Sequence, residues 1–226
     1  MKTVIVEFDE KEAAAAAQKA FDQIVGLGDG AGGFDLQPET DDEADAERFA
    51  AMNEGSKRRL RVYAKEAHER CSRRIALKAA YRFDEGRYFY ALTAGEGSAA
   101  ESDDVMAAFM EDAWATAYVN AGMELLREKI AEDLAERFPG DSEVVLSEAF
   151  GPGYFGESIE KTGEYLAAAG GGKIGITNLE GGAMIPEKSC TGMYIATRDP
   201  EIGPGPGCLK CAGNPAGCAY CSIRNK

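Results

Sequence analysis

Apolar and polar residues follow two different periods along the chain, and the period predicts where strands and helices lie. The opening MKTVIVEF contains four consecutive β-branched residues and predicts a strand. Next, EKEAAAAAQKAFDQIVGL predicts a helix that ends at the glycines of the following GLGDGAGG. Residues 45–81 predict a second helical stretch rich in Lys and Arg, and GRYFYALTAGEG predicts a strand with aromatic side chains.

The clearest predicted element is a long helix over residues 102–138. Ser102 is the expected N-cap, with Asp103 and Asp104 at the positive end of the helix dipole, and Pro139 and Gly140 end the helix. The apolar period predicts one broad buried face, made of Val105, Met106, Phe109, Met110, Ala113, Trp114, Ala117 and Ala121.

The C-terminal half predicts short strands and one further helix. SEVVLSEAF reads as a strand, and GPGYFGES as a turn into a helix that stops at three consecutive glycines. KIGITNLEGG, AMIPEKS and CTGMYIATRD predict strands joined by tight turns. Because helices and strands do not alternate as a regular βαβ repeat, we expect an α+β fold with long helices packed on antiparallel strands.

Composition and charge narrow the function classes. The chain is 45% hydrophobic and 28% charged, which is typical of a globular protein. Its net charge of −14 argues against nucleic-acid binding, which needs a basic surface. Nevertheless, eleven of the 25 Lys and Arg residues lie between Lys57 and Arg87. A solvated helix face is the simpler interpretation, and a docking surface for an acidic protein partner is the alternative.

Neither a signal peptide nor a membrane-spanning run is predicted, because MKTVIVEFDEKE becomes acidic before an apolar region forms. We therefore expect a soluble cytoplasmic protein with reduced thiols and no membrane partner. Cys71 and Cys190 lie far from the other cysteines, and we expect them to be small buried or half-buried residues.

The last nineteen residues contain the strongest chemical signal. Cys208, Cys211, Cys218 and Cys221 have the spacing C-x2-C-x6-C-x2-C, which allows two pairs of thiolates to face one ion or cluster. The spacing alone leaves a structural zinc ion and an iron–sulfur cluster equally open. Disulfides are the third alternative, which the reducing compartment disfavours.

Conventional catalytic motifs are missing from the sequence. The only histidine is His68, so no Ser/His or Cys/His arrangement is indicated, and neither a Walker A motif nor H-E-x-x-H occurs. A G-x-G-x-x-G match at residues 28–33 follows a predicted helix rather than a strand, so we interpret it as accidental.

The turn Gly151-Pro152-Gly153-Tyr154 has the features of a ligand site. Pro152 fixes the backbone, and the flanking glycines permit close approach of a ligand to the main chain. Tyr154 adds a flat ring, and the following helix N-terminus can bind a carboxylate. These groups suit a zwitterionic, nucleoside-like ligand, although a tight turn with a packed tyrosine is the simpler interpretation of the residues alone.

This turn and the later KIGITNLEGGAMIPEKSCTGMYI together resemble the activation domain of cobalamin-dependent methionine synthase, above all its stand-alone versions. The resemblance covers roughly residues 86–198. It implies three parts: residues 1–83 of unknown role, an activation-domain-like region at 84–203, and the four-cysteine tail at 204–226. Some stand-alone relatives also have a cysteine-rich tail that looks like an iron–sulfur site.

The resemblance implies reactivation of a cobalamin-dependent methionine synthase or a corrinoid methyltransferase. An electron reduces inactive cob(II)alamin on the partner protein, and S-adenosylmethionine supplies the methyl group that traps the reduced cobalt. A [4Fe–4S] cluster in the tail then becomes the favoured electron source, with zinc as the alternative. The alternative function is a non-catalytic binding module that keeps the fold and uses zinc to staple its tail.

The resemblance also implies which residues bind the cofactor. Gly151, Pro152, Gly153 and Tyr154 match the turn that holds S-adenosylmethionine, and Tyr194 matches an aromatic residue near the adenosyl group. Six residues match the second motif, namely Glu180, Met184, Pro186, Lys188, Ser189 and Gly192.

The chain departs from the family pattern at two positions that contact the ligand. Ala149 stands where the family has an arginine, and Asn120 stands near the position of an acidic residue. Charge-assisted contacts contribute roughly 1.5–3 kcal/mol each. Losing both is therefore expected to weaken S-adenosylmethionine binding by roughly a hundredfold or more.

Overall fold

The computed structural model describes residues 2–25, 43–153 and 157–198, with the backbone alone for residues 43–54. Several predictions concern residues outside these ranges. They include the four tail cysteines, Tyr154 and the glycines at 28–33.

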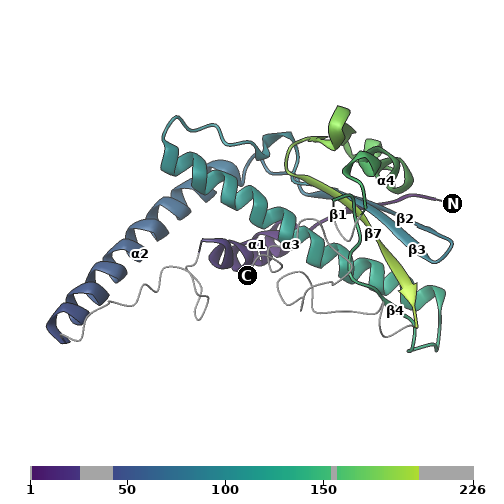
Figure 1. The fold of residues 1–226 in the computed structure, drawn as a ribbon, viewed down its shortest axis with the longest axis horizontal. Coiled ribbons are helices and arrows are strands. Elements are labelled where there is room, and N and C mark those ends of the chain that lie inside the picture. Colours follow the sequence, from purple (N-terminus) through teal and green to yellow (C-terminus); the bar gives the residue numbers. More distant parts are fainter. Residues whose placement is uncertain (1, 26–42, 154–156, 199–226) are drawn as a thin grey trace.

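The core of the protein is a five-stranded antiparallel sheet in the order β1-β2-β3-β7-β4 (Figure 1). The strands are β1 (Val4–Glu7), β2 (Lys78–Asp84), β3 (Arg87–Thr93), β7 (Ser189–Thr197) and β4 (Val145–Leu146). Two further strands, β5 (Thr177–Asn178) and β6 (Met184–Ile185), form a separate small hairpin. Strands from before and after residue 84 therefore share one sheet, and the expected division at 83/84 falls within the β2–β3 hairpin.

Helices cover both faces of this sheet, and the α+β prediction is confirmed. The helices are α1 (Glu10–Ile24), α2 (Glu43–Cys71), α3 (Val105–Arg137) and α4 (Thr162–Ala169). Leu126 and Ile130 of α3 pack against one face of the sheet, where they form one core with tyrosines that belong to β2, β3 and β7. Leu166 of α4 packs on the other face, against alanines of β2 and β3. A second core joins α1, α2 and the first half of α3.

The prediction of a helix extending to Tyr81 is wrong beyond Cys71. α2 ends there, and β2 pairs with both β1 and β3. Ala79 and Ala80 are both fully buried, because α3 lies over one face of the sheet and α4 over the other. A strand that is buried on both faces lacks the alternation of polar and apolar residues by which a strand is recognised. Of the predicted strand SEVVLSEAF, only Val145 and Leu146 form a strand, which is β4.

The buried face predicted for α3 is correct only beyond its first turn. Met110, Ala113, Trp114, Ala117 and Ala121 are buried. The first-turn members of the same stripe are exposed, with relative exposures of 85% for Val105, 43% for Met106 and 56% for Phe109. The α1–α2–α3 core begins at Met110.

The predicted N-cap of α3 is also wrong by two residues. The Asp104 carboxylate accepts a hydrogen bond from the Ala107 N–H at 2.9 Å and caps the helix. Ser102 instead accepts from the Asp104 N–H at 3.2 Å. Both residue types are good N-caps, so sequence preference alone does not choose between them.

Candidate functional site

A β-bulge in the segment 145–150, which pairs with β7, is the central feature of the candidate site. Val145 and Leu146 pair with Thr197 and Ala196, whereas Phe150 pairs with Met193. The segment therefore contains one residue more than the facing part of β7, so that positions 148 and 149 together oppose position 194. Bulges of this kind bend the strand and occur often beside functional sites.

Ser147 and Arg127 hold the bulge in place. The buried Ser147 hydroxyl accepts a hydrogen bond from the Ile195 N–H at 2.8 Å and donates to the Glu148 carbonyl at 2.7 Å. The Ser147 carbonyl accepts from Arg127 Nη1 at 3.0 Å, and the Leu146 carbonyl accepts from Nη2 at 3.4 Å. The arginine thus binds backbone carbonyl groups at the bulge that do not pair with β7.

Tyr194 lies beneath the bulge in an aromatic stack. The guanidinium carbon of Arg127 is 5.2 Å from its ring centre, and the Tyr90 ring stacks on it with centroids 5.1 Å apart. Tyr194 is only 2% exposed, and burial raises the pKa of its phenol to about 12. Its hydroxyl is therefore neutral, and the ring forms part of the sheet core under the expected ligand turn.

The turn that carries the predicted ligand residues lies beside β7. Gly151 and Pro152 are buried, and the Gly153 N–H donates to the Glu157 carbonyl at 2.9 Å. Gly153 has a φ of +87°, which favours glycine. Residues 151–153 and Tyr194 thus lie along the same strand, β7, and their roles in ligand binding stay a prediction. Tyr154 is outside the described residues.

Gly192 allows the turn segment to approach β7 closely. A Cβ atom at this position would lie 2.4 Å from the Phe150 carbonyl oxygen and 2.5 Å from the Tyr90 hydroxyl oxygen. No side chain fits there without movement of the backbone. This contact explains why the second motif has glycine at this position.

Two other residues of the second motif fix the start of β7. Lys188 Nζ lies 2.7 Å from the Asp112 carboxylate and 3.1 Å from Thr116 Oγ1, and so ties the strand to α3. Ser189 Oγ lies 2.6 Å from the Pro186 carbonyl oxygen. These contacts give both residues an architectural role.

Neither position of departure from the family pattern presents a charge. Ala149 is half-buried and packs against the core under the sheet, whereas Asn120 is exposed on α3. The nearest described cation at the bulge is Arg127, which the sequence reasoning missed. The sequence could have indicated Arg127 through its position, because it lies four residues after Met123 and three before Ile130, on the side of α3 that faces the sheet.

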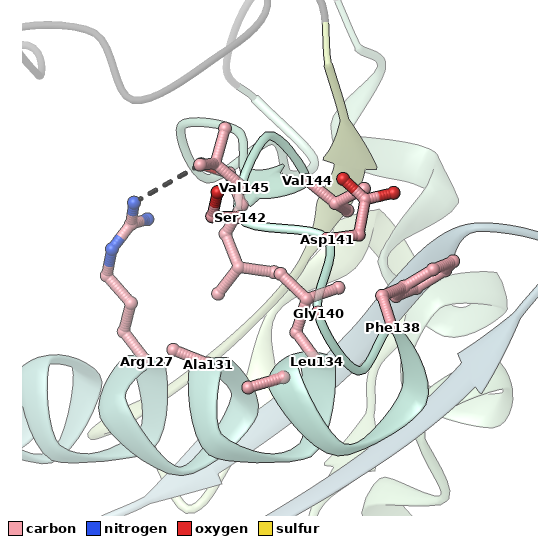
Figure 2. Close-up of a pocket in the computed structure, with 11 residues that line it drawn as sticks. Arg127, Ala131, Leu134, Phe138, Gly140, Asp141, Ser142, Val144 and Val145 are labelled. Atoms are coloured by element: carbon pink, nitrogen blue, oxygen red, sulfur yellow. Dashed lines mark hydrogen bonds between the residues drawn. The ribbon is translucent and has the colours of Figure 1, made fainter.

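A cavity of about 520 Å³ adjoins the bulge, between the second half of α3 and the segment 138–146. Figure 2 shows Arg127 extending from α3 toward this segment at one side of the cavity. The opposite wall is largely apolar, with Leu134, Phe138 and Val144. None of the predicted ligand residues that the structure describes lines this cavity.

Among the side chains that the structure describes, in 2–25, 55–153 and 157–198, no group of three His, Cys, Asp or Glu has the geometry to hold a metal ion. Burial raises the pKa of Cys71 to about 11 and that of Cys190 to about 12, so both thiols stay protonated at neutral pH. No described helix is long and apolar enough to cross a membrane.

An antiparallel sheet with a long helix on one face and a short helix on the other defines an α+β domain. No protein-family model matches the chain, and no curated protein is significantly similar in sequence. In structure, it is similar to the crystal structure of the MetH reactivation domain bound to AdoHcy, with a TM-score of 0.59 and 13% sequence identity. The match covers 88% of this chain and 79% of that chain. The fold is therefore that of a methionine synthase reactivation domain, as the motif resemblance predicted.

Proposed function

We propose that this protein reactivates a corrinoid enzyme, either a cobalamin-dependent methionine synthase or a corrinoid methyltransferase. The observation that carries the proposal is the structural similarity to a reactivation domain over 88% of the chain. That domain was crystallised with AdoHcy, which is the molecule that S-adenosylmethionine becomes when it gives up its methyl group. The turn at 151–153 and Tyr194 lie together at one sheet edge, which supports a ligand site there.

The proposed reaction consists of one electron transfer followed by one methyl transfer. An electron reduces cob(II)alamin on the partner protein to cob(I)alamin. The cobalt electron pair then forms a bond to the methyl carbon, the carbon–sulfur bond of S-adenosylmethionine breaks, and S-adenosylhomocysteine leaves. A [4Fe–4S] cluster held by Cys208, Cys211, Cys218 and Cys221 would supply the electron.

The described residues of the chain would bind and orient the methyl donor. The backbone of Gly151 and Gly153 permits close approach of the ligand, and the Arg127–Ser147 contacts keep the neighbouring bulge in position. Ala149 offers no charge for the ligand carboxylate. We therefore expect S-adenosylmethionine to bind roughly a hundredfold more weakly than with both charged contacts in place.

The test begins with anaerobic purification of the wild type beside Cys208→Ala/Cys221→Ala. We expect a brown protein with iron and sulfide, and the loss of both in the variant. Cob(II)alamin reduction is then followed by visible spectroscopy with and without S-adenosylmethionine. Calorimetric titration with S-adenosylhomocysteine measures the ligand site independently of the cluster.

A second candidate function is a non-catalytic binding module with a zinc-stapled tail. The observation that favours it is the packing of Ala149 into the core, where the family has an arginine. A colourless protein that contains one zinc ion and leaves cob(II)alamin unchanged would establish this alternative and remove the electron source.

A further inference from the structure

One half of α2 is anchored firmly, while the other half projects from the body of the protein. Figure 1 shows the N-terminal end of α2 extending away from the sheet and from α3. At the anchored end, Trp114 Nε1 donates to the Ala64 carbonyl at 2.8 Å. Arg70 and Arg74 bind the buried carboxylate of Glu111 at 2.8 and 3.2 Å. The C-terminal part of the helix is therefore anchored to the body of the protein.

The outer face of α2 combines exposed arginines with exposed apolar residues. Arg58, Arg59 and Arg61 are exposed and form no ion pair within the described part of the chain. Between and beside them, Val62 is 54% exposed and Tyr63 is 43% exposed. A hollow of about 720 Å³ lies along this face and is bordered by four of these five residues. Arg and Tyr beside apolar contacts are the residues that dominate protein–protein interfaces.

The charge of this face is opposite to that of the whole protein. Residues 57–74 contain eight Lys and Arg and two Glu, in a chain whose net charge is −14. An acidic partner is consequently attracted to α2 and repelled by the remaining surface, which selects one orientation of approach. A nucleic acid is far more densely charged, and the acidic remainder of the molecule opposes its binding.

We propose that Arg58, Arg59, Arg61, Val62 and Tyr63 form the docking surface for an acidic surface of the corrinoid-carrying partner. This inference rests on the proposed function for the identity of the partner. The arginines steer the encounter, and the two apolar side chains contribute contacts that exclude water. Because all five residues lie within one continuous helix, little backbone order has to be gained on binding.

The experiment uses the full chain and a cobalamin-loaded methionine synthase that lacks its own activation domain. Binding is measured by calorimetry at several salt concentrations, and cob(II)alamin reduction is measured separately with free and with protein-bound cobalamin. The test variant is Arg58→Glu/Arg59→Glu/Arg61→Glu. The control is Lys2→Glu/Lys19→Glu/Lys173→Glu, which makes the same charge change at exposed positions elsewhere.

We expect the test variant to raise Kd by at least about tenfold and to flatten its salt dependence, while the control changes Kd by less than about threefold. Val62→Ala/Tyr63→Ala should raise Kd by about tenfold at every salt concentration. Activity on free cobalamin should be the same in all variants. All substituted side chains are exposed, so circular dichroism should show unchanged folding.

Equal Kd values for the test and control variants, or no binding by the wild type, would overturn the docking surface. If the wild type binds duplex DNA and the test variant does not, the face binds a nucleic acid and the proposal is overturned. Failure of the proposed function gives a different result, namely no reaction with free or bound cobalamin. The binding measurement still decides the docking proposal in that case.

Discussion

Arg127 should be essential for the stability of the bulge beside β7, and replacing it with methionine tests this. Arg127→Met keeps much of the aliphatic stem, so the loss is mainly that of the guanidinium. The buried Ser147 carbonyl then loses its partner at 3.0 Å, and the ring of Tyr194 loses the cation 5.2 Å from its centre. An unsatisfied buried carbonyl costs about 1–3 kcal/mol, and the cation–π contact adds about 0.5–2 kcal/mol.

The expected total is a loss of about 1.5–5 kcal/mol in the free energy of unfolding. For a chain of 226 residues, this corresponds to a fall in Tm of about 3–20 °C. Urea unfolding followed by circular dichroism measures the loss. Lys129→Met on the same helix is the control, because Lys129 is exposed and pairs with Glu132 at the surface. Such a pair contributes less than about 1 kcal/mol.

Hydrogen exchange separates a local effect at the bulge from a general loss of stability. The Ile195 N–H donates to the Ser147 hydroxyl, so its exchange should accelerate more than that of the amides of β3. Arg127→Met with a stability within 0.5 kcal/mol of the wild type, or with uniform changes in exchange across the sheet, would refute the assignment of Arg127 to the bulge.

Three further predictions concern other parts of the molecule. Gly192→Ala should cost about 1–3 kcal/mol because of the 2.4 Å approach at its Cβ position, whereas Gly172→Ala, with nothing within 4 Å, should change stability by less than about 0.5 kcal/mol; urea unfolding compares them. Desolvation lowers the pKa of His68 below 6.5, so its contribution to stability is complete above pH 6.5 and is lost as the pH falls through the folded-state pKa. Trp114 is the only tryptophan and lies 4.1 Å from that ring, so its fluorescence should be quenched over the same pH range, and His68→Phe should abolish the change. Glu111→Ala removes the buried partner of Arg70 and Arg74 and should cost about 1–3 kcal/mol, because solvent still screens both arginines and Arg74 keeps its pair with Glu101; the shift in the midpoint of urea unfolding measures this.

Local patterns predicted the elements that have a helical apolar period or β-branched and aromatic residues between turn signals, and the resemblance predicted the fold. The helix over 105–137, the strands β1, β3 and β7, and the turn at 151–153 follow from periodicity and turn residues. β2 was missed because KAAYRFD lacks an alternating pattern and its Lys, Arg and alanines favour a helix, whereas β3, which is buried on both faces as well, was identified by its aromatic residues. The exposed start of α3 was missed because its apolar period continues beyond the core that buries it.

The candidate site was predicted as a set of residues rather than as an arrangement. The glycines, Pro152 and Tyr194 have recognisable types and spacings, and the structure brings the described ones to one edge of the sheet. The bulge depends on which residue of the segment 145–150 meets which residue of β7. Pairing between residues so far apart in sequence leaves no local signature, and the role of Arg127 depends on it.

The extra residue in the segment beside β7 makes the length of that segment part of the site. Side chains alternate between the two faces of a sheet, so one inserted residue exchanges the faces for everything that follows it. Deleting position 148 or 149 would shift the pairing of Phe150 with Met193 by one residue and would exchange the faces of the residues that follow. The length of the connection between β4 and this turn is therefore as much a part of the predicted site as the identity of its residues.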